Sequence, residues 1–148
     1  MANTGAYCLL PSEIESRLQE AGINPTAQRI AICRYVLCEA DHPTPEEVKA
    51  WVDQNFPKLS LTTVYNTLRT LVEVGLLQEF RFSHTDTSVY DCNVSKHYHF
   101  VDLETGKITD IQPEKVKIEA GLGGGLIAED YELVIRGKTM GIAKDPVP

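Results

Sequence analysis

The hydrophobic pattern of this chain changes at Gly75 from helical to alternating spacing. Before Gly75, a segment that starts at Ser60 places Val64, Leu68 and Leu71 on one helical face. After it, residues 76–82 and 87–91 tend to alternate between apolar and polar, and they flank a polar stretch. That second pattern predicts a β-hairpin. Helices followed directly by a hairpin indicate a winged helix-turn-helix.

Three more helices are predicted upstream. One covers 13–21 and ends at Gly22, and a second covers 27–39 with Thr26 as a possible cap. The third begins with the strongest start signal in the chain: Thr44 at the N-cap, Pro45 at the first position and Glu47 three residues after the cap. It runs to about residue 55.

The remainder of the chain predicts a mixed α/β unit. Strands are expected at 97–103, 107–111 and 131–136, a short helix at 113–120 and a glycine-rich connection at 121–125. The predicted fold class is therefore α+β. We expect an N-terminal winged helix-turn-helix domain at 1–91, followed by a small α/β domain at 92–148.

Length and charge narrow the classes of function. The chain has 148 residues and a net charge of -7, which argues against a non-specific nucleic-acid coat protein but allows a specific DNA binder with a local basic patch. The apolar runs are too short to span a membrane, and residues 1–10 lack a secretory signal, so a cytoplasmic location is expected.

The helix that starts after Ser60 presents an outer face suited to DNA. Hydroxyl groups and arginines bind phosphates, threonine methyls and a tyrosine ring contact thymine methyls, and asparagine pairs with adenine. The expected DNA-binding residues are Arg29, Thr62, Thr63, Tyr65, Asn66 and Arg69. A solvated amphipathic helix is the alternative, but the preceding helix and the following hairpin favour DNA binding.

A set of histidines and aspartates points to a metal. His97 and His99 are two apart in a predicted strand and share one face. Asp91 precedes them, Asp110 follows within reach of a short strand pair, and His42 lies in the turn before the third helix. Nitrogen and carboxylate ligands suit Fe(II), Mn(II) or Zn(II). A surface strand with two histidines is the alternative, and His84 is expected to be a plain hairpin residue.

These motifs resemble the ferric uptake regulator (Fur) family. The resemblance rests on 25–29, 60–68, Gly75-Leu76 and the metal motif, and it extends from about residue 13 to 137. It implies a homodimeric, metal-dependent transcriptional repressor that binds a palindromic DNA operator through its first domain and dimerises through its second. His42, Asp91, His97, His99 and Asp110 match the regulatory metal site of the family. Two aspartates in that set, and Asn66, are similar to the peroxide-sensing (PerR) and iron response regulator (Irr) branches.

The chain also departs from the family pattern. Most members hold a structural zinc in two CxxC pairs, but the corresponding positions here carry Asp102, Thr105, Thr139 and Ile142. No structural zinc is therefore expected, and the second domain should be held by packing alone. Lys96 and Tyr98 stand where an auxiliary metal site has ligands elsewhere, which favours one metal site per subunit.

The four cysteines are expected to be reduced and not to form the sensor. Cys33 and Cys38 are five apart on one predicted helix, which does not align them for a disulfide, so both are interpreted as buried small hydrophobes. Cys92 is the one thiol for which redox activity or metal ligation stays open, although a strand would point it away from Asp91.

Three functional alternatives stay open, and the resemblance implies the first two. A PerR-like regulator would bind Fe(II) and lose DNA when peroxide oxidises His42 or His97, while an Irr-like regulator would sense haem near His97 and His99. A non-haem metal enzyme could use the same ligands, but the sequence shows no lid or nucleophile beyond them. We expect a regulator and not an enzyme.

Overall fold

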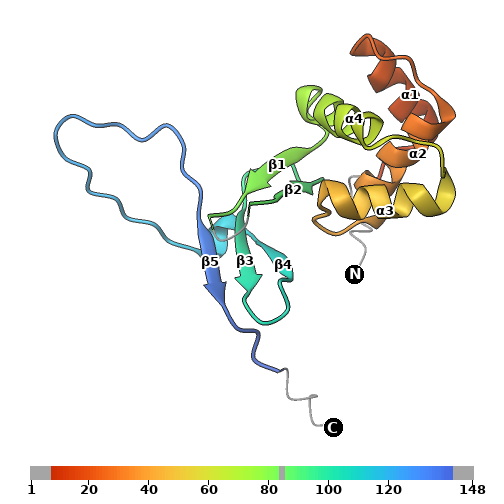
Figure 1. Ribbon diagram of the computed structural model, residues 1–148. Helices are drawn as coiled ribbons and strands as arrows, with labels where there is room; N and C mark the ends of the chain where they lie inside the picture. Colours follow the sequence, from red (N-terminus) through yellow and green to blue (C-terminus); the bar gives the residue numbers. More distant parts are fainter. Residues whose placement is uncertain (1–7, 84–85, 142–148) are drawn as a thin grey trace, which may run out of the picture. The chain divides into compact units, whose positions relative to one another are not determined.

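The computed structural model describes residues 8–83 and 86–141, and the chain divides into two compact units between residues 94 and 95. The first unit contains α1 (Pro11–Glu20), α2 (Ala27–Arg34), the π-helix η1 (Tyr35–Glu39), α3 (Pro45–Asn55), α4 (Leu61–Glu73), β1 (Gln78–Arg81) and β2 (Ser88–Asp91) (Figure 1). The second contains β3 (Tyr98–Asp102), β4 (Ile108–Ile111), the 3-10 turn η2 (Pro113–Lys115) and β5 (Val134–Gly137). The predicted α+β class is confirmed.

Side-chain caps begin three of the four α-helices where the sequence predicts them. The hydroxyl oxygens of Thr26, Thr44 and Ser60 each accept a hydrogen bond from the backbone N–H three residues later, at 3.1–3.2 Å. The segment predicted as one helix over 27–39 differs, because its last five residues form η1. Short π-helical turns are uncommon and often lie near functional residues, and this one ends three residues before His42.

The core of the first unit consists of the apolar faces of all its helices. Its most deeply buried members come from every helix: Ile14, Leu18, Ile32, Cys33, Val36, Val48, Val52, Val64, Leu68 and Leu71. Burial of aliphatic side chains of this size stabilises a fold by about 1.5–3 kcal/mol each. This core fixes the orientation of α4, so its opposite face is presented to solvent.

The hairpin is joined to the loop in front of α3. β1 and β2 pair antiparallel, with Gln78 opposite Asp91. The backbone N–H of Tyr90 donates to the carbonyl of Pro43 at 3.0 Å. Because Pro43 follows His42 directly, this bond ties the His42 loop to the strand that ends at Asp91.

The second unit is built on a three-stranded sheet with the order β4-β3-β5. β3 pairs antiparallel with β4, which places His99 opposite Asp110, and parallel with β5, which places Asp102 opposite Gly137. The central position of β3 buries Tyr98, His99, Val101 and Asp102.

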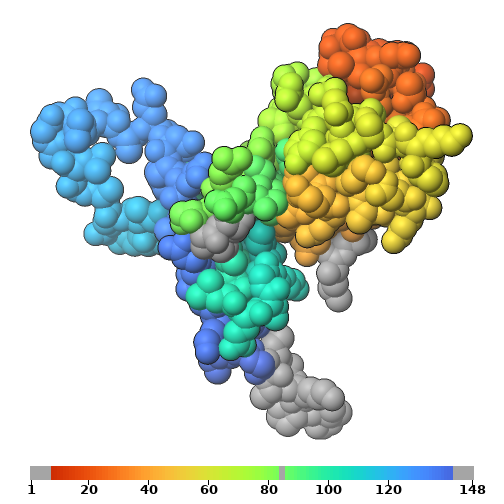
Figure 2. All heavy atoms as spheres, in the orientation of Figure 1, coloured from red at the N-terminus to blue at the C-terminus, as the bar shows by residue number. Residues whose placement is uncertain are grey.

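The chain between η2 and β5 corrects the sequence prediction. Instead of a helix over 113–120, only the turn Pro113–Lys115 forms, and the final strand begins at Val134 and not at residue 131. A short helix is stable only where it packs an apolar face, and residues 117–132 are exposed throughout. Figure 2 shows this segment, in medium blue, as a narrow band of atoms. None of the helices in the described residues is long and apolar enough to cross a membrane.

Candidate metal centre

The first unit supplies a histidine and an aspartate to a candidate metal site. His42 has a left-handed backbone with φ of 45°, which turns the chain between η1 and α3. Its Nε2 lies 3.1 Å from Oδ2 of Asp91 at the end of β2. The other oxygen of Asp91 accepts the backbone N–H of Asn93 at 2.8 Å, which fixes the orientation of the carboxylate. Asp91 is 3 % exposed, so its charge is held away from water.

Asp41 orients the imidazole of His42. Its carboxylate lies 2.6 Å from Nδ1 of His42, and a carboxylate can only accept. Nδ1 therefore donates to Asp41, and a His42 ring that binds an ion through Nε2 would keep its one proton on Nδ1. A carboxylate behind a histidine is the usual support of a metal-bound imidazole. Sequence reasoning missed Asp41, although its place directly before His42 was a usable signal.

The second unit supplies two histidines and an aspartate. His97 and His99 have their Nε2 atoms 3.0 Å apart. Oδ1 of Asp110 lies 3.5 Å from Nε2 of His97 and 3.6 Å from Nε2 of His99. The histidines are almost fully buried, whereas the Asp110 side chain is 20 % exposed. Two histidines and one carboxylate on one face form a set that binds divalent first-row metals.

The spacing of these three atoms fits a single ion. A circle through them has a radius of about 2.0 Å, so an ion slightly above their plane is about 2.1 Å from each, the length of metal–nitrogen and metal–oxygen bonds. The backbone carbonyl of Ser95 lies 2.7 Å from Nδ1 of His97. Because a carbonyl only accepts, that nitrogen donates, and Nε2 of neutral His97 presents a lone pair towards the set.

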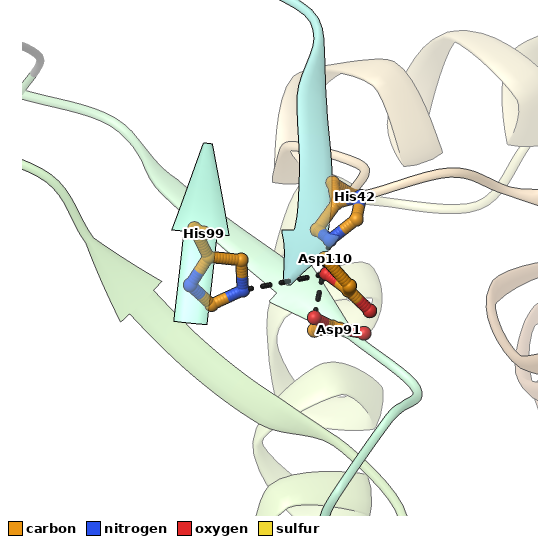
Figure 3. A group of neighbouring side chains, drawn as sticks. All are labelled: His42, Asp91, His99 and Asp110. Atoms are coloured by element: carbon orange, nitrogen blue, oxygen red, sulfur yellow. Dashed lines mark hydrogen bonds and ion pairs between the residues drawn. The ribbon is translucent and has the colours of Figure 1, made fainter. Parts of the chain in front are cut away.

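The structure thus brings together His42 with Asp91, and His97 and His99 with Asp110. Figure 3 draws His42, Asp91, His99 and Asp110. Neutral imidazole nitrogens and carboxylate oxygens suit Mn(II), Fe(II) and Zn(II), so the donor chemistry of both sets fits the expected metals. His84 lies outside the described residues.

Most of the residues expected to bind DNA lie on the outer face of α4. Thr62, Tyr65, Asn66 and Arg69 are exposed, whereas Thr63 and Arg29 are half-buried. Oγ1 of Thr63 lies 3.1 Å from the capping hydroxyl of Ser60. The guanidinium of Arg29 donates to the carbonyl of Asn24 at 2.8 Å.

Tyr65 has a partner that the sequence did not reveal. Its hydroxyl donates to Oε1 of Glu46 in α3 at 3.3 Å. Partial burial, followed by the Glu46 carboxylate, raises the pKa of Tyr65, so the phenol keeps its proton as a donor. A polar hollow beside it is lined by both signs of charge: Arg69 and Arg81 together with Glu46, Glu79 and Asp86.

Three positions that hold zinc ligands elsewhere in the resembled family are linked here by hydrogen bonds. Asp102 accepts the backbone N–H of Glu104 at 2.8 Å and of Thr105 at 3.3 Å. The hydroxyl of Thr139, followed by these amides, holds the pKa of Asp102 down at about 2. Through these hydrogen bonds Asp102 joins the turn after β3 to the segment after β5. The second unit is therefore held by hydrogen bonds as well as by packing. Ile142 lies outside the described residues.

The cysteine prediction is wrong for one pair. Cys8 and Cys38 form a disulfide, although both were expected to be reduced. The partner of Cys38 lies 30 residues away, so helical spacing around Cys33 could not indicate it. Cys33 and Cys92 are buried in the core of the first unit, as small hydrophobes.

Comparison with known proteins identifies the family. Residues 20–122 match the model of the ferric uptake regulator family. The chain belongs to the ferric uptake regulator family. It is 38 % identical over 103 residues to the peroxide-responsive repressor PerR of Staphylococcus aureus, a match that covers 69 % of each protein.

Solved structures of Fur-family regulators resemble this chain. The PerR protein of Streptococcus pyogenes, whose structure concerns peroxide sensing and gene regulation, is 29 % identical with a TM-score of 0.52, over 94 % of this chain and 93 % of that one. A zinc-bound manganese uptake regulator is 25 % identical with a TM-score of 0.65, over 86 % of this chain and 98 % of that one. These names mention peroxide, manganese and zinc, and they give no support to the haem alternative.

Proposed function

We propose that this Fur-family chain is a homodimeric repressor that binds operator DNA when a divalent ion occupies a site built from both units. The ligands would be His42 and Asp91 from the first unit and His97, His99 and Asp110 from the second. The observation that carries the proposal is the orientation of the histidines: His42 and His97 each have Nδ1 beside an acceptor, which turns Nε2 towards a carboxylate.

The two units would be coupled through these ligands. His42 precedes α3 by three residues and is tied to β2 through Pro43, so its position follows that of the DNA-binding unit. His99 and Asp110 are fixed by pairing of β3 with β4. If both sets bind one ion, a single relative orientation of the units is favoured. A coupling free energy of about 1–3 kcal/mol changes DNA affinity by about 5–150-fold.

Peroxide is the proposed signal, in line with the two PerR relatives. A bound Fe(II) ion would supply the redox chemistry by which peroxide oxidises a ligating histidine, and Mn(II) would not. His42 and His97 are the proposed targets. Oxidation of either would disturb the imidazole that its orienting acceptor holds in place, weaken the metal set and release DNA.

Dimerisation would use the second unit. Its exposed chain carries large apolar side chains with little burial in one subunit, among them Ile118 at 41 %, Leu126 at 68 % and Ile127 at 88 % exposure. A second copy that covers them would gain the burial that the single chain lacks, since contiguous apolar surface usually marks an interaction site.

Selection of duplexes from a randomised DNA library tests this function. The full chain is expected to enrich a palindromic duplex with Mn(II), to lose it with a chelator, and to lose it irreversibly when Fe(II)-loaded protein meets peroxide. Light scattering should give the mass of a dimer. A monomer that enriches no duplex at any Mn(II) concentration would refute the proposal.

A further inference from the structure

The cysteine pair of the first unit lies outside the metal site and the DNA-facing helix. Cys8 precedes α1 by three residues, and Cys38 lies in η1. Their Cα atoms are 4.9 Å apart, inside the range in which a disulfide closes without moving the backbone. The pair joins segments 30 residues apart and encloses α1 and α2.

The other two cysteines are less exposed to solvent than this pair. Cys33 has no exposed surface, and its burial raises the pKa of the thiol to about 12, which removes the reactive thiolate. Cys92 is 7 % exposed. In contrast, Cys8 is exposed and Cys38 is half-buried. Of the four cysteines, only Cys8 and Cys38 are both reachable from solvent and close enough to each other to form a disulfide.

We propose that Cys8 and Cys38 form a reversible thiol–disulfide switch that responds to oxidants without the metal. This inference rests on the proposed function, because a repressor works beside genomic DNA, where cellular reductants keep thiols reduced. Disulfides in such a compartment are usually transient and redox-sensing. The switch would therefore be open in unstressed cells and closed under oxidative stress.

The reaction balances with hydrogen peroxide as the oxidant. One thiolate attacks peroxide, which breaks the O–O bond, forms a sulfenic acid and releases water after proton uptake. The second thiolate then attacks the sulfenic sulfur, the S–S bond forms, and a second water leaves. Two thiols lose two electrons and one peroxide becomes two waters. The exposed Cys8 suits the first step, and Cys38 resolves it.

Closure would act on the segment that carries His42. Cys38 precedes His42 by four residues, and the intervening Ala40 is held to η1 by a bond from its N–H to the carbonyl of Tyr35 at 2.9 Å. A bridge from Cys38 to the segment before α1 restrains η1 at the end from which the His42 loop starts. It also restricts the unfolded chain, so the closed form should melt on the order of 10 °C above the open form.

Thiol trapping on the full-length protein tests the switch. Reduced protein in chelator is treated with one equivalent of hydrogen peroxide, alkylated and digested for mass spectrometry. We expect a Cys8–Cys38 linked peptide in wild type and in the control Cys92→Ser, its loss in Cys8→Ser and in Cys38→Ser, and its disappearance with dithiothreitol. The melting temperature of the protein should rise when the Cys8–Cys38 disulfide forms and should fall again when dithiothreitol reduces it.

Three results would overturn the switch: independent alkylation of both thiols after peroxide, a bridge between two subunits in place of the internal one, or a bridge that resists dithiothreitol. The last would make the disulfide a permanent staple. Neither metal nor DNA enters this assay, so its failure leaves the proposed repressor intact. Failure of duplex selection, in turn, would refute the repressor without changing the trapped peptides.

Discussion

Replacing Asp110 with asparagine removes the carboxylate from the three ligands proposed in the second unit while keeping the size of the side chain. Its Oδ1 lies 3.5 and 3.6 Å from Nε2 of His97 and Nε2 of His99, so the carboxylate completes the triangle that is proposed to hold the ion. Loss of a group that merely supports a ligand weakens metal binding by about 10–100-fold, and loss of ligand charge should reach the upper end, about 100-fold.

This change in affinity converts into a thermal shift. Mn(II) at one hundred times the wild-type Kd stabilises the folded protein by about 2.7 kcal/mol, and the same concentration stabilises Asp110→Asn by about 0.4 kcal/mol. For a chain of this size the melting temperature should then rise by about 5–10 °C in wild type and by about 1 °C in the variant. Thermal unfolding followed by circular dichroism, with and without Mn(II), measures both.

The matched control is Asp130→Asn. Asp130 lies in the same unit but pairs with Lys96 at 2.6 Å and is 78 % exposed. The same chemical change there should leave the Mn(II) shift at its wild-type size. An Asp110→Asn protein with a full Mn(II) shift would show that the triangle of the second unit does not bind the ion. Equal losses in both variants would show a general charge effect instead.

Three further substitutions test other parts of the account. Tyr65→Ala should relax the sequence preference of duplex binding, because the ring is exposed on α4, and an unchanged preference in a selection experiment would contradict its assignment to base reading. Thr44→Ala removes the cap of α3 and should lower the free energy of unfolding by about 1 kcal/mol, with Thr44→Ser as the control in urea titrations. Asp102→Asn should destabilise the second unit at neutral pH; since the folded pKa lies below the unfolded one, this difference should persist above pH ~4 and disappear as pH falls through about 2. A difference that survives at pH 2 would show that the carboxylate charge is not its source.

Local sequence signals predicted the first unit well. Thr26, Thr44 and Ser60 mark helix starts through hydrogen bonds made within three residues, so the information lies in the adjacent sequence. The hairpin and the pairing of His99 with Asp110 followed from alternation and from short connections. Family resemblance, not spacing, suggested that His42 belongs with Asp91.

The failures depend on partners distant in sequence. Cys38 forms a disulfide with Cys8, and Tyr65 donates a hydrogen bond to Glu46. No local sequence pattern indicates either partner. The helix expected over 113–120 failed because its apolar side chains have nothing to pack against in one chain. The change to η1 inside the second helix had no sequence signal that we recognised.

The central claim is that one ion takes ligands from both units and thereby controls DNA binding. His42→Asn tests it, because asparagine tolerates the left-handed backbone of His42 but removes the imidazole. Affinity for the selected duplex is measured against Mn(II) concentration for wild type, for His42→Asn and for His84→Asn, a histidine outside the motif. Wild type and His84→Asn should bind DNA about 5–150-fold more tightly with Mn(II), whereas His42→Asn should not respond. A His42→Asn protein whose DNA affinity rises with Mn(II) as in wild type would contradict the account.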